Sequence, residues 1–177
     1  NHRERRRWHR DYIEAILSRD LQDVTEIRKH DSMKKLISVT AAWSSKFLDI
    51  SAIRSGLGIQ RPTLENYLQA LQTLFLVDKL PAWTATDYAR VGKRDKLFMT
   101  DPGLMASLLR YPENVRDFTD DQTGKLAETM IYCELQAILD ANDDRYDLYH
   151  YRDNEKREID FLIDDDENGF IGIEVKA

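Results

Sequence analysis

The chain has 177 residues, which is enough to bury one sizeable core or two small ones. Charged residues make up 33% of the sequence, and no apolar run approaches the roughly 18 residues of a membrane span. This composition predicts a soluble protein without a membrane partner. The single cysteine, Cys133, excludes an internal disulfide and a cysteine-based zinc site, and it fits a reducing cytoplasm.

The net charge of −6 is unevenly distributed along the chain. Residues 1–110 contain 19 Lys and Arg against 13 Asp and Glu, whereas residues 111–177 contain 7 against 19. This asymmetry favours two modules, one basic enough to approach nucleic acid and one acidic enough to hold divalent cations. The alternative is two solvated surfaces of opposite sign.

The sequence begins with an arginine-rich stretch that has no apolar segment behind it, so we do not expect this stretch to be a signal peptide. We expect a cytoplasmic fragment of a longer protein. Apolar residues at helical spacing from Trp8 onward predict a helix over residues 8–29. We interpret residues 1–30 as a linking helix that follows a missing domain.

Three helical segments are predicted in close succession within residues 33–76. The first covers residues 33–47, and the second begins at the cap residue Asp49 and stops at Gly56. Gly58 permits a tight turn before the third, whose residues Leu64, Tyr67, Leu68 and Leu71 form one apolar stripe. The stretches 74–77, 80–83 and 96–99 are predicted to form two or three short strands, and a helix is predicted at 103–109.

This order predicts a helix-turn-helix followed by a hairpin, and hence a winged-helix domain over residues 31–110. The hairpin encloses a basic loop that also contains Lys96. The polar face of the third helical segment and the basic loop are suited to contacts with phosphates, although many such domains bind proteins instead. The candidate nucleic-acid-binding residues are Arg61, Thr63, Asn66, Arg90, Lys93 and Arg94.

A second module is predicted over residues 111–177, after a boundary segment at 111–121. One helix is expected at 122–139, and strands are expected at about 146–152, 157–163 and 170–176. The whole chain is therefore predicted to be α+β, with a helical part followed by a helix and three strands.

Four residues of the second module carry a candidate catalytic site. Strand alternation places Asp160 on the polar face of one strand, and Glu174 and Lys176 on the polar face of the next. If Asp160 lies opposite Glu174 in a hairpin, then Ile163 pairs with Ile171 and the apolar faces coincide.

The paired carboxylates of Asp160 and Glu174 are suited to binding Mg²⁺ or Mn²⁺. Lys176 is then placed to orient or deprotonate a water molecule, and Glu128, on the predicted helix, is placed to complete the metal shell. The alternative is an ordinary polar sheet face, on which Glu174 and Lys176 form a surface ion pair.

Several short stretches, spread over almost the whole chain, match a known arrangement. They include Leu57-Gly58-Ile59, Leu80-Pro81-Ala82-Trp83, Lys96-Leu97-Phe98-Met99, Glu158-Ile159-Asp160-Phe161 and Ile173-Glu174-Val175-Lys176. Together they resemble the C-terminal region of bacterial AAA-type ATPases that carry an uncharacterised C-terminal domain joined to a nuclease-like fold.

The resemblance implies a winged helix, a PD-(D/E)xK nuclease-like module and an upstream ATPase domain. The chain has no Gly-x-x-x-x-Gly-Lys-Ser/Thr loop, so ATP binding would belong to residues outside it. The sequence stops at Ala177, before the helix and strand that complete such a fold, and we expect the exposed sheet edge to pair with another copy.

Two main hypotheses follow for an ATPase region that engages nucleic acid. The first is Mg-dependent phosphodiester hydrolysis by Glu128, Asp160, Glu174 and Lys176. The second is a non-catalytic coupling module that binds DNA or protein and retains an inactive nuclease-like fold. A domain that binds proteins only is a weaker third alternative.

Overall fold

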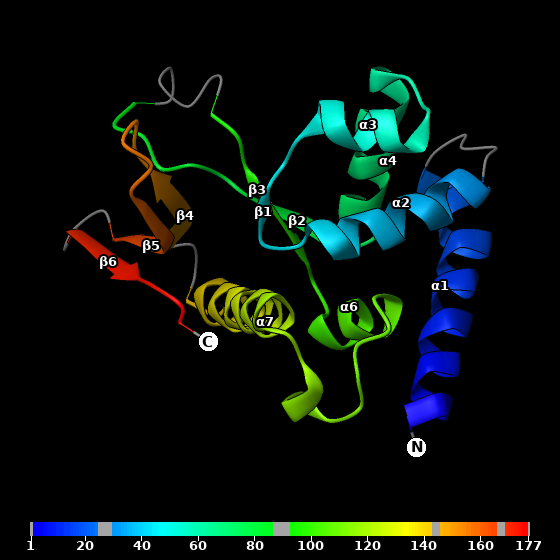
Figure 1. The fold of residues 1–177 in the computed structure, drawn as a ribbon. Coiled ribbons are helices and arrows are strands. Elements are labelled where there is room, and N and C mark those ends of the chain that lie inside the picture. The colour runs from blue at the N-terminus through cyan, green and yellow to red at the C-terminus, as the bar shows by residue number, and fades with distance from the viewer. Residues whose placement is uncertain (1, 25–29, 87–92, 143–145, 166–168, 177) are drawn as a thin grey trace.

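The computed structural model describes residues 2–24, 30–86, 93–142, 146–165 and 169–176, and these form a mixed α+β fold (Figure 1). The helices are α1 (His2–Val24), α2 (His30–Trp43), α3 (Ile50–Leu57), α4 (Arg61–Thr73), α6 (Pro102–Leu108), α7 (Asp120–Asp140) and the 3-10 helix η1 (Val115–Asp117). The strands are β1 (Lys46–Phe47), β2 (Val77–Leu80), β3 (Lys96–Met99), β4 (Tyr146–Arg152), β5 (Glu158–Asp165) and β6 (Gly169–Ile173).

The helical part of the chain packs on one face of a small antiparallel sheet with the strand order β1-β3-β2. Helices α1, α2, α3, α4 and α6 contribute buried residues to this first core, and Leu97 and Met99 contribute the sheet face. The apolar stripe predicted for α4 is confirmed, because Leu64, Leu68 and Leu71 are each at most 1% exposed. The sheet is therefore an integral wall of the core.

The two helices predicted on either side of Gly58 are present as α3 and α4, and their local causes are those expected from the sequence. The side chain of Asp49 caps α3 by accepting a 2.9 Å hydrogen bond from the backbone N–H of Ala52. Gly58 adopts a left-handed conformation with φ +65° directly after α3, where a side chain would be strained. The helix ends at Leu57, one residue beyond the predicted stop at Gly56.

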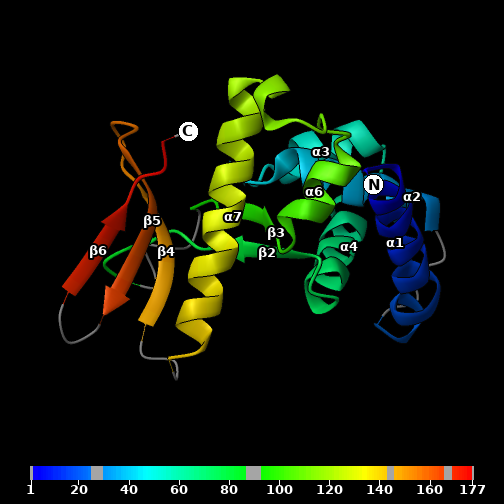
Figure 2. The same ribbon diagram turned by 90° about the horizontal axis from the view of Figure 1, so that it is seen from below.

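The second sheet has the order β4-β5-β6 and is antiparallel throughout. Its predicted register is confirmed, because Ile163 lies opposite Ile171. Helix α7 covers one face of this sheet and begins at a capping box formed by Thr119 and Gln122. Figure 2 shows α7 lying between the second sheet and the helical part.

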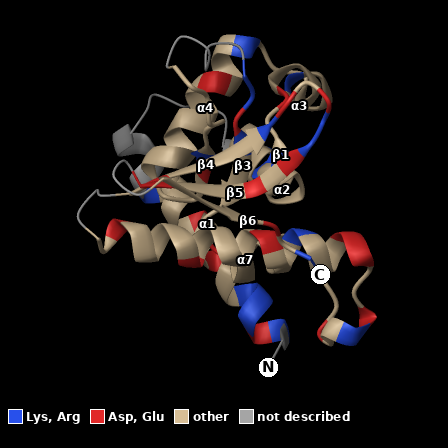
Figure 3. Cartoon of the chain, turned by 90° about the vertical axis from the view of Figure 1, so that its left-hand side faces the viewer, with Lys and Arg blue, Asp and Glu red and all other residues tan. Residues whose placement is uncertain are grey.

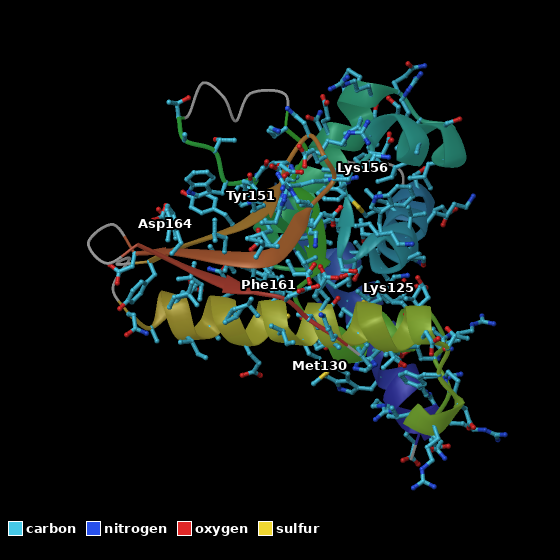
Figure 4. All side chains as sticks on the ribbon, turned by 60° about the vertical axis from the view of Figure 1, so that its left-hand side comes forward. Lys125, Met130, Tyr151, Lys156, Phe161 and Asp164 are labelled. Carbon is cyan, nitrogen blue, oxygen red and sulfur yellow. The ribbon has the colours of Figure 1, made fainter. Side chains whose placement is uncertain are left out.

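A second core joins the two sheets through α7. Leu80 and Phe98 reach it from the first sheet, Tyr132 from α7, and Phe161 from the second sheet. The rings of Phe98 and Tyr132 stack with centroids 4.2 Å apart, and Phe161, labelled in Figure 4, lies between β5 and α7. The two parts of the chain therefore share buried apolar surface.

Hydrogen bonds also cross between the parts. The hydroxyls of Ser44 and Thr129, both fully buried, lie 2.9 Å apart, and the Tyr132 hydroxyl donates to Asp78 at 2.7 Å. An isolated parallel bridge joins Ala82 to His150 on β4. A buried polar group that lacked its partner would destabilise the fold, so these bonds favour one relative placement of the parts.

Three strand and helix boundaries differ from the sequence prediction. Residues 74–77 do not form a strand of their own, because α4 continues to Thr73 and Phe75 then turns with φ +52°. The strand predicted at 80–83 is β2 at Val77–Leu80, followed only by the bridge at Ala82. The helix predicted over 33–47 ends at Trp43, and its last two residues form β1, which pairs with β3.

The last strand is also shorter than predicted. β6 ends at Ile173, and the backbone N–H of Val175 donates to the side chain of Asp160 at 3.0 Å instead of to a strand backbone. β6 forms an edge of the described sheet and carries Phe170 and Ile171, which are 55% and 57% exposed. Pairing of this edge with another copy stays a prediction.

Two further expectations concern the first helix and membrane-spanning segments. The first helix begins earlier than predicted, at His2, and residues 25–29 of the predicted span lie outside the described residues. Within the described residues, no helix combines the length and the apolar character needed to cross a membrane.

Candidate functional site

The carboxylates of Glu128 on α7 and Asp160 on β5 converge on the ammonium group of Lys96, which lies on β3. Lys96 Nζ is 2.7 Å from Glu128 Oε1 and 3.1 Å from Asp160 Oδ1. The side chain of Lys96 is 4% exposed, and those of Glu128 and Asp160 are 16% and 20% exposed. We call these three residues the ion-pair junction, because they connect the first sheet to α7 and the second sheet.

Strand alternation explains why a lysine reaches this buried position. All four residues of β3 are buried, which identifies β3 as the central strand between two packed layers. Leu97 and Met99 face the helical core, and therefore Lys96 and Phe98 face the second core. A charge on that face is tolerated only with partners, and Glu128 and Asp160 provide them.

The electrostatics of the junction are set by burial as well as by pairing. Burial raises the pKa of Glu128, and the nearby charge of Asp160 raises it further. The charge of Lys96 and hydrogen bonds from Lys96 and Ser45 lower it, but they do not offset the burial. The Glu128 carboxylate therefore depends on the lysine for the strongest favourable contribution to its charged form in this position.

Glu174 and Lys176 lie apart from the ion-pair junction and at the surface. They pair with each other at 3.7 Å, and their side chains are 65% and 81% exposed. The predicted strand register is correct, but the chain leaves the sheet at Ile173, so the segment that follows does not continue the polar strand face. The geometry therefore brings together Glu128 and Asp160, and does not add Glu174 or Lys176 to them.

As arranged, the four predicted residues do not fit a bound Mg²⁺ or Mn²⁺. The Lys96 ammonium lies between the carboxylates of Glu128 and Asp160, and the exposed Glu174 pairs with Lys176. Over the described ranges of the chain, no group of three or more His, Cys, Asp or Glu side chains is arranged to hold a metal ion. The predicted metal site stays a prediction that requires rearrangement of Lys96 and Glu174.

Two adjoining pockets open beside the junction. The acidic pocket has a volume of about 500 Å³ and is lined by Asp49, Lys96, Glu128, Glu158 and Asp160 among others. The basic pocket has a volume of about 290 Å³, and its lining includes Lys93, Arg94, His150 and Arg152. Phe47 and Arg94 line both pockets, so the two are neighbours, and we refer to them together as the depression between the sheets.

Comparisons with known proteins match two family models to two consecutive stretches of the chain, and the ion-pair junction contains residues from both. Residues 1–119 match a family model described as "Domain of unknown function (DUF8612)". The chain belongs to the DUF8612 family. Residues 123–177 match a second model, "Domain of unknown function (DUF4143)". In this DUF8612 chain, Lys96 comes from the first match, and Glu128 and Asp160 come from the second.

Two mycobacterial proteins are similar to this DUF8612 chain: uncharacterized protein Mb2031c of Mycobacterium bovis and uncharacterized protein Rv2008c of Mycobacterium tuberculosis. Each is 24% identical over 161 residues, which cover 89% of the chain and 35% of the relative. The chain therefore spans about a third of the length of these relatives. No solved structure matches the chain at a significant level.

The nucleic-acid-binding residues predicted on α4 present little net positive charge. Arg61 pairs with Glu65 at 2.8 Å, Thr63 is half-buried, and Asn66 is exposed. Arg90 lies outside the described residues. The described cations of the predicted loop, Lys93 and Arg94, instead line the basic pocket.

Sequence reasoning missed the role of Lys96 and the participation of His150 and Arg152. The sequence analysis places Lys96 in a basic loop suited to phosphate contact, although its position two residues before Phe98 puts both on one strand face. His150 is 2% exposed, and its contribution depends on pairing with residues 81–83, which no local pattern predicts.

Proposed function

We propose that the chain is a non-catalytic coupling module of a larger AAA-type ATPase, and that it engages nucleic acid at the depression between its two sheets. The observation that carries the proposal is the burial of the Lys96 ammonium between Glu128 and Asp160. The acids of the nuclease-like part then serve to hold that part against the helical part. A cation of the chain itself takes the position in which hydrolysis would require a metal.

The order of elements supports the winged-helix interpretation of the helical part. A helix, a short strand, two helices and a hairpin follow each other as α2, β1, α3, α4, β2 and β3. The sheet order β1-β3-β2 places the first strand beside the last, as this interpretation requires. The hairpin is not a free wing, because Lys96 and Phe98 pack against the second part.

The ATPase assignment is supported by the resemblance of the sequence and by the length of the relatives. The chain covers 35% of Mb2031c and of Rv2008c, which leaves room in proteins of that length for further domains. The match of residues 123–177 to DUF4143 agrees with the resemblance to an uncharacterised domain near the C-terminal end of such ATPases. ATP hydrolysis itself would belong to residues outside this chain.

A coupling role requires that displacement of one part moves the other. The buried ion-pair junction, the hydroxyl pair of Ser44 and Thr129, and the stack of Phe98 on Tyr132 provide such a connection. Figure 3 shows the charges that each part presents, with basic residues at the start of α1 and acidic residues along α7. Nucleic acid would meet the basic part first, because phosphates favour Lys and Arg.

The second candidate function is Mg-dependent phosphodiester hydrolysis. The correct hairpin register and the convergence of Glu128 and Asp160 beside an open pocket favour it. It requires Lys96 to leave both carboxylates and Glu174 to approach them, which separates it from the coupling proposal in a measurable way.

Isothermal titration calorimetry with Mg²⁺ and Mn²⁺, together with a DNA digestion assay, tests the proposal. We expect no cation uptake and no cleavage by the chain, and salt-sensitive DNA binding that Asp160→Asn retains. Asp117→Asn is the matched control, because Asp117 is an exposed carboxylate outside the junction and outside the predicted metal site. Mn-dependent cleavage that Asp160→Asn abolishes would overturn the coupling proposal in favour of hydrolysis.

A further inference from the structure

The basic pocket contains a buried histidine whose hydrogen-bonding capacity is only half used. His150 Nε2 lies 2.9 Å from the backbone oxygen of Arg94, and it must be the donor because a carbonyl oxygen only accepts. His150 Nδ1 is buried and has no hydrogen-bond partner. A buried polar atom without a partner is rare in folded proteins and indicates a missing water molecule or ligand.

Positive charge surrounds this histidine. Lys93 is exposed and forms no ion pair or hydrogen bond with another described residue. Arg94 pairs with Asp49 at 3.3 Å, and the Arg94 side chain is 64% exposed, so the pair is weak and the arginine is available to a competing anion. Arg152 binds Glu158 through Nε, which is only one of the five N–H groups of its guanidinium.

Two further contacts determine which charges the basic pocket presents. The guanidinium of Arg152 lies 4.7 Å from the centre of the Phe47 ring, which holds the arginine against the pocket wall. The carboxylate of Asp153 is the acidic group in the lining, and it is engaged by Arg157 at 2.6 Å and by two backbone N–H groups. The cations of the lining therefore remain the main charges that a ligand would meet.

The geometry points to a phosphoryl-binding site in the basic pocket, formed by Lys93, Arg94 and Arg152 around His150. A phosphate group offers two terminal acceptor oxygens in a diester and three in a monoester, and it suits a pocket that presents one ammonium and two guanidinium groups. The lone pair of His150 Nδ1 would accept a hydrogen bond from the O–H of a protonated phosphate monoester or, for either ester, from a bridging water molecule. A pocket volume of about 290 Å³ accommodates a phosphoryl group with its water.

The phosphoryl group has two sources with the same chemistry, a small phosphate compound or the backbone of a nucleic acid. The inference rests on the proposed function only for the second source. It would place the nucleic-acid contact in the depression between the sheets, where the face of α4 supplies little net positive charge.

Calorimetric titration of the full chain with inorganic phosphate, and separately with a short single-stranded oligonucleotide, tests the site. We expect at least one probe to bind, and Lys93→Gln to weaken that binding roughly tenfold through loss of a charge-assisted hydrogen bond. Arg116→Gln is the matched control, because Arg116 is an exposed cation outside the pocket lining. It should leave the affinity unchanged.

The two probes also identify the source. Binding of inorganic phosphate alone identifies a small phosphate compound, and binding of the oligonucleotide identifies a nucleic-acid backbone. Absence of binding by both probes, or equal weakening by Lys93→Gln and Arg116→Gln, would overturn the site. Equal weakening by the two substitutions would overturn the site alone, because Lys93 lies outside the ion-pair junction on which the coupling role depends. Absence of oligonucleotide binding would in addition remove the nucleic-acid contact from the proposed function.

The nitrogen NMR signal of His150 Nδ1 tests the part played by the histidine. Saturation with the bound probe should shift this signal, because Nδ1 gains a hydrogen-bond partner. An unchanged signal in the presence of Lys93-dependent binding would overturn the assignment of His150 to the site.

Discussion

At the scale of single residues, Lys96 is the most consequential side chain of the molecule. Removing its charge leaves the carboxylates of Glu128 and Asp160 without the cation that they share, and burial raises the pKa of Glu128. We expect Lys96→Met to lower the free energy of unfolding in urea by about 3–5 kcal/mol. The triple change Lys96→Met, Glu128→Gln and Asp160→Asn should recover much of this loss, because no unpaired charge remains.

The matched control for this prediction is Lys176→Met. The ion pair of Lys176 with Glu174 is exposed, and exposed pairs contribute at most about 1 kcal/mol. Equal losses for Lys96→Met and Lys176→Met would show that the ion-pair junction does not hold the two parts together.

His150 should make the stability depend on pH. Burial lowers the pKa of His150 to about 4 from its ordinary value of 6.5, and the charges of Lys96, Arg152 and Lys93 act in the same direction. The unfolded chain therefore takes up a proton at His150 in a range where the folded chain does not. The stabilisation is complete above pH 6.5 and decreases by roughly 3 kcal/mol as the pH falls to about 4.

Urea denaturation of the parent chain and of His150→Gln across this pH range measures the effect. Gln keeps an N–H donor for the Arg94 carbonyl and does not titrate. The variant should show a shallower decrease in stability between pH 6.5 and 4. Parallel profiles of the two proteins would contradict the burial of a neutral histidine.

At the scale of elements, two glycines near the end of α3 should respond to alanine substitution in opposite ways. Gly58 has φ +65°, so Gly58→Ala should cost about 1–2 kcal/mol in unfolding free energy. Gly56 lies inside α3, and nothing occupies the space that a Cβ would take. Gly56→Ala should therefore stabilise the chain by roughly 0.5–1 kcal/mol, and thermal denaturation of both variants checks the opposite signs.

Elements whose cause is local were predictable from the sequence. Asp49, Gly58 and the apolar spacing of α4 identified the helix-turn-helix, and alternation of polar and apolar residues fixed Ile163 opposite Ile171. Elements that depend on contacts between residues far apart in the sequence were not predictable. The two-residue strand β1 exists only because β3 pairs with it, and Lys96 is buried only because α7 covers its strand face.

The candidate site was predictable to the same limit. Glu128 and Asp160 were predicted to lie together, from a helix face and a strand face assigned by periodicity, and their carboxylates meet at Lys96. The position of Glu174 could not be inferred, since Asp160 accepts the N–H of Val175 with its side chain and the strand ends there. A competing side-chain hydrogen bond of this kind leaves no trace in residue spacing.

At the scale of the whole molecule, the shared second core predicts one cooperative unfolding unit. Leu80 and Phe98 from the first sheet and Phe161 from the second lie in the same apolar cluster. Separating the parts would expose this cluster and the ion-pair junction together, so neither part should unfold alone.

Tryptophan fluorescence reports on the two parts independently. Trp43 ends α2 and packs against the first core, whereas Trp83 contacts Phe170 of the second sheet with ring centroids 5.2 Å apart. Variants that keep only Trp43 or only Trp83 should give the same midpoint in urea.

Phe98→Ala removes the ring stacked on Tyr132 and should lower the free energy of unfolding by about 3–5 kcal/mol. In that background the Trp83 signal should change at lower urea than the Trp43 signal, because the second sheet has lost its main apolar contact with the first. Different midpoints before that change would contradict the single unfolding unit on which the coupling role depends.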